Sequence, residues 1–195
     1  MNSKPRLLAA TTLVLTISPT AAFAHPTIFH TTPLMAGLAH PLSGLDHILA
    51  MVAVGMWAAQ RGGRALWAFP AAFIGIMIVS GVAGMAGFAL PMVEPGIAAS
   101  VLVLGLLVAS AAPLPVWAGS AAIAVFAAFH GNAHGLEAGH LHNAGLYALG
   151  FAVSTASLHA IGIGAGLATR SARMETALRA GGAGIALAGA TLFFA

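Results

Sequence analysis

Long apolar stretches separated by short polar breaks run along this chain of 195 residues. A membrane-crossing helix needs about 20 mostly apolar residues. After residue 24 the chain contains six stretches of that length or nearly so. They cover residues 41–60, 65–88, 96–112, 116–133, 144–168 and 176–195. This pattern predicts an all-α membrane protein, a bundle of six transmembrane helices.

Turn-forming and helix-stopping residues occupy the breaks between these stretches. The segment from Arg61 to Arg64 reads Arg-Gly-Gly-Arg, which is typical of a turn, and prolines follow at positions 91, 95, 113 and 115. Proline ends a helix because it lacks a backbone N–H and clashes with the preceding turn. Residues 137–143 and 170–175 are polar and are expected to form two further loops.

The first 24 residues have the pattern of a cleavable secretory signal peptide. Lys4 and Arg6 give a basic start, residues 7–17 form the apolar run, and Ala22-Phe23-Ala24 is a small-x-small cleavage site. The alternative is an uncleaved first membrane helix, although the apolar run is short for a span. We therefore divide the chain into a signal peptide, residues 1–24, and a transmembrane domain, residues 25–195.

Composition supports a membrane protein and excludes several other classes. The chain is 59% hydrophobic and 6% charged, with a mean hydropathy of +0.96, whereas soluble domains carry about 25% charged residues. Seven basic against four acidic residues form no clustered basic patch, so a nucleic-acid partner is not expected. Cysteine is absent, which excludes disulfides and thiolate metal sites. The 24 glycines suit close helix–helix packing in lipid.

The positions of the charged residues predict the orientation in the membrane. If the mature N-terminus lies outside, every arginine of the mature chain falls on the cytoplasmic side, as the positive-inside rule requires. Glu94 and Glu137 then fall on the opposite side. We expect a multi-pass protein of the inner (cytoplasmic) membrane with a periplasmic mature N-terminus. The arginines are Arg61, Arg64, Arg170, Arg173 and Arg179.

The first predicted helix carries ligand-type side chains near its start. His40 and His47 are seven residues apart, so on a continuous helix they share one face, which Met51 continues. Asp46 lies beside His47 and can be a ligand or an acceptor that orients an imidazole. Gly44 leaves room for a neighbouring helix or a hydrated ion. Ionisable side chains inside a span are costly and usually functional.

The fourth predicted helix ends in a second set of such side chains. His130 and His134 are four residues apart and Glu137 is seven beyond His130, so the three share one face. Two imidazoles at this spacing can chelate one ion, although the glutamate that zinc proteases place between them is absent. Gly131 and Gly135 would let another backbone approach. Because both sets fall at the outer side of the membrane, we expect them to converge on a single cation.

Imidazole and carboxylate ligands without thiolate suit nickel, cobalt, zinc or Cu(II), and affinity alone does not choose among them. A histidine in a membrane helix can instead be a packing group that donates to a backbone carbonyl. That reading stays open for both sets and for the mid-helix His159. The sequence assigns no role to the remaining histidines, which are His25, His30, His140 and His142.

These motifs resemble those of the HupE/UreJ family of nickel/cobalt permeases. The run from His40 to Gly55 is similar to the first-helix signature of the family, and the run from Phe129 to Glu137 is similar to its second motif. The predicted signal peptide, six helices and overall length also fit. The resemblance implies uptake of Ni²⁺, with Co²⁺ as an alternative cargo, and no prosthetic group. The residues that it implies as metal ligands are His40, Asp46, His47, His130, His134 and Glu137.

Three functions follow from these observations. The first is a secondary transporter that imports Ni²⁺ for maturation of a hydrogenase or urease. The sequence has no Walker A motif, so no ATPase subunit is evident, and uptake should weaken at low pH because the imidazoles must be neutral. The second is a zinc-dependent intramembrane hydrolase, and the third is a bis-histidine haem protein. A divalent metal ion and the lipid bilayer are the expected partners, and homo-oligomerisation stays open.

The two motif-bearing helices, the first and the fourth, run in opposite directions in this topology. Such an arrangement is typical of transporters built from two inverted halves. The sequence therefore also suggests an inverted repeat of three plus three helices, although residue-level similarity between the halves is slight.

Overall fold

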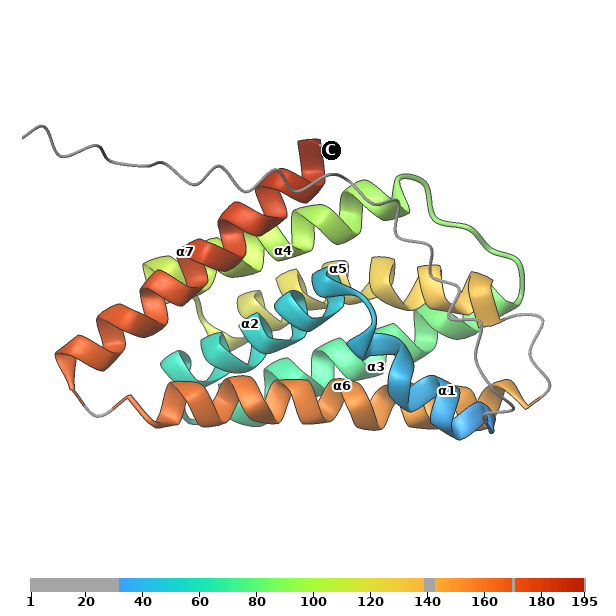
Figure 1. Cartoon of the computed structure of the whole chain (residues 1–195), viewed down its shortest axis with the longest axis horizontal. Helices are drawn as coiled ribbons and strands as arrows, with labels where there is room; N and C mark the ends of the chain where they lie inside the picture. The colour runs from blue at the N-terminus through green and yellow to red at the C-terminus, as the bar shows by residue number, and fades with distance from the viewer. Residues whose placement is uncertain (1–31, 139–142, 170, 195) are drawn as a thin grey trace, which may run out of the picture.

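The computed structural model describes residues 32–138, 143–169 and 171–194. All the regular secondary structure in this part of the chain is helical. The predicted signal peptide and His25, His30, His140 and His142 lie outside the described residues. The elements are α1 (Pro33–Ala39), a 3₁₀ turn η1 (His40–Leu42), α2 (Leu45–Arg61), α3 (Ala65–Met85), α4 (Val93–Ser110), α5 (Val116–Ala138), α6 (Ala144–Leu167) and α7 (Ala172–Phe194) (Figure 1).

Five of these helices, α3 to α7, are long and apolar enough to cross a membrane. A sixth span is obtained if the segment Pro33–Leu42 and helix α2 are counted together, and these two pieces meet at an angle of 79°. The prediction of one continuous helix over residues 41–60 was therefore wrong. Pro41 cannot donate a backbone hydrogen bond, and Gly44 is extended, with φ −103° and ψ 122°. These two residues interrupt the helix between the first two predicted ligands.

Several helix ends differ from the prediction by a few residues. Helix α5 continues through Glu137, which had been placed in a loop. Helix α4 begins at Val93, before Pro95, because proline is tolerated in the first turn of a helix. Helix α3 stops at Met85, and Gly87 follows with φ +87°.

The helices pack mainly as three pairs, α2 with α6, α3 with α5, and α4 with α7, while α1 lies against the start of α6 (Figure 1). Glycines allow the backbones to touch at each crossing. A methyl group on Gly55 of α2 would overlap the carbonyl oxygen of His159 on α6, and one on Gly105 of α4 would overlap the backbone nitrogen of Ala186 on α7. The glycine content therefore serves close packing, as predicted.

The two ends of the bundle differ in chemistry. We call the end that holds α1, the starts of α2, α4 and α6, and the end of α5 the motif end. The opposite end, where α2 and α6 finish, is the arginine end. It carries all the arginines that the described ranges contain, Arg61, Arg64, Arg173 and Arg179. Arg179 donates to the carbonyl oxygen of Ala109 at 2.8 Å, where the negative end of the α4 dipole favours a cation.

Candidate metal centre

Six side chains from two distant segments meet at the motif end. The turn η1 and the first turn of α2 supply His40, Asp46 and His47, and the last nine residues of α5 supply His130, His134 and Glu137. The ring centroids of His47 lie 4.4 Å from those of His134 and 4.6 Å from those of His130. The His40 and His134 centroids are 4.6 Å apart. The structure thus brings together all six residues that the sequence singled out.

His40 and His47 reach this cluster by a different route from the predicted one. A shared helical face was expected, but the break after Leu42 puts His40 in a separate turn. The bend carries His40 back over the end of α5, where its Nε2 lies 3.3 Å from Oε2 of Glu137. Gly44 leaves room for a side chain of the cluster itself. A methyl group there would lie 2.6 Å from Oδ1 of Asp46, so this glycine makes room for the aspartate.

Asp46 fixes the orientation of the His47 ring. Its Oδ1 lies 2.8 Å from Nδ1 of His47 and also accepts the backbone N–H of His47 at 2.8 Å. Because a carboxylate only accepts hydrogen bonds, the proton of the neutral ring sits on Nδ1. The Nε2 atom of His47 is left with its lone pair, which is the arrangement found in carboxylate–histidine–metal sites. Of the two roles that the sequence left open for Asp46, this geometry favours orienting the imidazole.

Glu137 does the same for His134. Its Oε2 lies 3.3 Å from Nδ1 of His134, so Nδ1 donates and Nε2 carries the lone pair. The Nε2 atoms of His134 and His47 face each other closer than a normal hydrogen bond. Two neutral imidazoles oriented in this way present lone pairs to one another, and these repel unless a proton or a cation lies between them. This pair is the most direct indication of a cation site in the described structure.

His130 is oriented by a residue that sequence reasoning missed. Its Nε2 lies 2.8 Å from Oγ of Ser100 on α4, and that hydroxyl donates its own proton to the carbonyl oxygen of Ile97 at 2.6 Å. Ser100 therefore accepts from Nε2 of His130. Nδ1 of His130 is left free, without a partner in the described part of the chain. Ser100 is one of only two serines in an otherwise apolar stretch, and this was the available signal.

Exposure falls steadily across the cluster. The side chains of Glu137 and His40 are 52% and 25% exposed, whereas His130 is 0% exposed. Nitrogen and oxygen atoms of His40, His134 and Glu137 also lie within 4.8 Å of one another, a spacing that one metal ion can span. The cluster is therefore open on one side, at the carboxylate, and closed on the other, at His130.

Close contact between α3 and α5 positions the two histidines of α5. A methyl group on Gly131 would overlap the carbonyl oxygen of Met77, and one on Gly135 would overlap that of Gly81. The predicted role of these glycines is confirmed. Between them Asn132 donates to the carbonyl oxygen of Phe88 at 2.7 Å and accepts the N–H of Leu90 at 2.8 Å. It thereby anchors the connection from α3 to α4.

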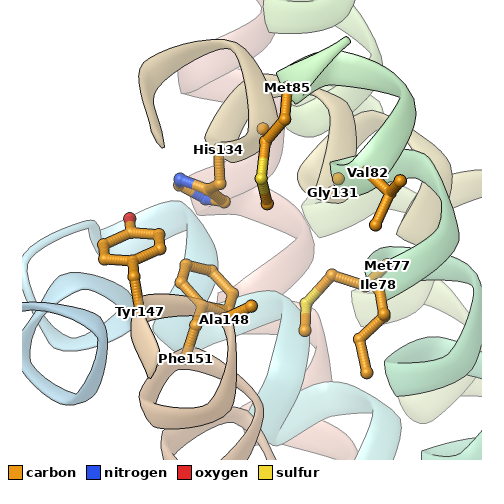
Figure 2. A pocket seen from close by; sticks show the side chains of 11 residues that line it. Met77, Ile78, Val82, Met85, Gly131, His134, Tyr147, Ala148 and Phe151 are labelled. Atoms are coloured by element: carbon orange, nitrogen blue, oxygen red, sulfur yellow. The ribbon is translucent and has the colours of Figure 1, made fainter. Parts of the chain in front are cut away.

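A small cavity of about 50 Å³ adjoins His134 between α3, α5 and α6, and Figure 2 shows the His134 ring beside those of Tyr147 and Phe151. The Phe151 centroid lies 4.5 Å from that of His134. The walls are almost entirely apolar side chains, and the space suffices for a water molecule or two. Sequence reasoning did not identify these aromatic neighbours, because nothing in an apolar helix marks which residues face the cluster.

The other predicted features lie away from the cluster or stay untested. Met51, which was expected to continue the His40–His47 face, is a fully buried core residue. His159 lies deeper on α6, is 1% exposed, and neither of its ring nitrogens has a hydrogen-bond partner among the described residues. Leaving such a group unpaired costs about 1–3 kcal/mol. The inverted repeat stays a prediction.

Comparison with known proteins gives a consistent result. A family described as "HupE / UreJ protein" matches residues 13–192. A protein from Rhizobium leguminosarum bv. viciae named "Protein HupE" is 48% identical over 183 residues, which cover 93% of this chain and 95% of that protein. No solved structure matches the chain.

Proposed function

Because this chain belongs to the HupE/UreJ family, we propose that it is a secondary transporter that carries Ni²⁺, or Co²⁺, across the cytoplasmic membrane for the maturation of a hydrogenase or urease. The family is considered one of transporters rather than enzymes. The metal is the cargo and not a resident cofactor. It would enter at the motif end, facing the periplasm, and leave at the arginine end.

The facing Nε2 atoms of His47 and His134 carry this proposal. Each ring is turned by a carboxylate so that its lone pair points at the other ring. A divalent cation between them would gain two imidazole ligands and relieve their repulsion. His40, Glu137 and Nδ1 of His130 supply further nitrogen and oxygen donors on either side of the pair. Such borderline ligands suit late transition metals better than Mg²⁺ or Ca²⁺.

Charge and energetics support import. With the arginine end in the cytoplasm, the positive-inside rule is satisfied. An inward-negative potential favours entry of a divalent cation by about 4.6 kcal/mol per 100 mV, twice the value for one charge. This term can drive accumulation without ATP.

The haem alternative finds no support in this geometry. The His40 and His134 rings are in edge contact at 4.6 Å, and the nitrogens of His47 and His134 meet directly. These contacts leave no gap for a porphyrin between the histidines. The hydrolase alternative would use the same ligands, but no additional contact among the described residues favours it.

The test is uptake of radioactive nickel by cells that lack their own importers, in competition with Co²⁺, Zn²⁺ and Cu²⁺. His47→Ala should abolish uptake, and Asp46→Asn should lower apparent metal affinity about 10- to 100-fold, as is typical when the hydrogen-bond partner that orients a metal-binding histidine is lost. Leu45→Ala is the matched control, since that side chain is the chain neighbour of Asp46 but is 61% exposed. Wild-type uptake by His47→Ala at equal protein level would refute the proposal.

A further inference from the structure

The unpaired His159 lies midway between the motif-end cluster and the arginine end. On the inner face of α6, Phe151 packs against His134 and His159 follows eight residues later. Gly166, seven residues further, lines a cavity at the arginine end. With a rise of 1.5 Å per residue, His159 is about 12 Å beyond Phe151 and about 10 Å before Gly166. Only this histidine provides an imidazole in the described part of that interval.

Aromatic contacts connect His159 to the innermost histidine of the cluster. The Phe73 ring on α3 lies 5.6 Å from the His130 centroid and 5.2 Å from the His159 centroid. On the same face of α6, one turn before His159, the hydroxyl of Thr155 lies 3.9 Å from Sδ of Met77. Both of these neighbours are buried. His159 therefore packs against an apolar ring, and a hydroxyl and a thioether meet one helical turn before it.

The cavity at the arginine end provides a polar region beyond His159. It has a volume of about 560 Å³ and lies where α2, α4, α6 and α7 meet. Its lining includes the polar side chains of Gln60, Thr169, Ser171 and Glu175. A cation that reached this space could be hydrated again. The stretch between His130 and this cavity is the part of the bundle in which a dehydrated ion would be least stable.

We propose that His159 is a second, transient binding site for the transported cation. The cation would reach it from His130 past the Phe73 ring and would then move on to the cavity at the arginine end. This inference rests on the proposed transport function. A buried imidazole with both nitrogens unpaired in the described structure is not a satisfied packing group, since that role requires a hydrogen-bond acceptor. A single neutral imidazole binds a late transition metal weakly, which suits a site that must release the ion.

Two apolar substitutions of similar size separate ligation from packing. His159→Leu fills the space and offers no ligand atom, whereas His159→Met fills it and offers a thioether sulfur. In proteoliposomes with an inward-negative potential, His159→Leu should lower Ni²⁺ uptake at least tenfold, and His159→Met should retain at least threefold more uptake than His159→Leu. Calorimetric binding of Ni²⁺ to either purified variant should stay within about threefold of wild type, because the motif-end cluster is intact.

Wild-type uptake by His159→Leu would overturn the inference, and so would equal loss of uptake in the Leu and Met variants, which would show a packing role. His159→Gln, which keeps a polar head, serves if the apolar variants do not fold. His159→Gln should also lower Ni²⁺ uptake at least tenfold relative to wild type. Wild-type uptake by this variant would contradict a cation-binding role for His159. Failure of the underlying function gives a different result, in which the unaltered protein neither binds nor transports Ni²⁺ and His47→Ala changes nothing.

Discussion

At the scale of single residues, three hydrogen-bond acceptors orient the imidazole rings of the cluster. Asp46, Glu137 and Ser100 accept N–H hydrogen bonds from the rings of His47, His134 and His130, respectively, and so decide which nitrogen of each ring keeps a lone pair. A free histidine exchanges between two tautomers. Here the three buried rings are each held in one, with the unprotonated nitrogens of His47 and His134 turned toward each other. In the proposed transporter, the ligand geometry would therefore be prepared before an ion arrives.

Ser100→Ala tests this preparation at its deepest point. Removing the hydroxyl leaves the N–H of His130 buried without an acceptor, which costs about 1–3 kcal/mol of stability. The ring can then turn, and we expect metal affinity to fall about tenfold or more. Ser110→Ala on the same helix is the control, because that exposed hydroxyl bonds only to carbonyls of its own helix. Thermal unfolding and calorimetric Ni²⁺ binding measure both effects, and equal results for the two serines would contradict the assignment.

At the scale of helices, glycine contacts set how closely the ligand-bearing elements approach. Helix α5 lies on α3 through Gly131 and Gly135, and helix α2 lies on α6 through Gly55 and Gly162. The first contact fixes the positions of His130 and His134, and the second places His159 beside α2. Packing of small residues is the main source of helix association in lipid, where the hydrophobic effect between helices is lost.

Gly131→Ala should therefore act on both stability and transport. The added methyl group overlaps the carbonyl oxygen of Met77, so α3 and α5 must separate, at a cost of about 1–3 kcal/mol for overpacking. We expect a lower unfolding temperature in detergent and strongly reduced uptake. Gly75→Ala on α3 is the control, since a methyl group there meets no atom within 4 Å. A Gly131→Ala protein as stable and active as the Gly75→Ala protein would show that the crossing is not tight.

At the scale of the whole molecule, the two ends are chemically distinct. The motif end carries the six-residue cluster of histidines and carboxylates, and the arginine end carries the described arginines, one of which donates to a carbonyl at the end of α4. If the positive-inside rule holds, the cluster faces the periplasm and the cavity near Glu175 faces the cytoplasm. Import then follows the direction of the membrane potential.

Single cysteines can test this orientation cleanly, because the natural chain has none. Ala89→Cys lies in the exposed loop between α3 and α4 at the motif end, and Leu114→Cys lies in the exposed loop between α4 and α5 at the arginine end. In intact cells a membrane-impermeant maleimide should label the first and not the second. The reverse pattern would mean that the cluster faces the cytoplasm and would refute import by this route.

The sequence by itself determined the apolar helices and singled out the six side chains that the fold gathers at the motif end. The length of an apolar segment is a local property of the sequence, and it decides whether a helix can span the bilayer. An ionisable side chain such as Asp46 or His130 stands out in such a segment because burying it is costly. Only the tertiary structure decided how those residues meet. The bend at Pro41 and Gly44, the hydroxyl of Ser100 on another helix, and the position of His159 behind Phe73 depend on contacts between segments far apart in the chain. Helical periodicity describes one helix at a time, so it predicted a shared face for His40 and His47 where the fold uses a break.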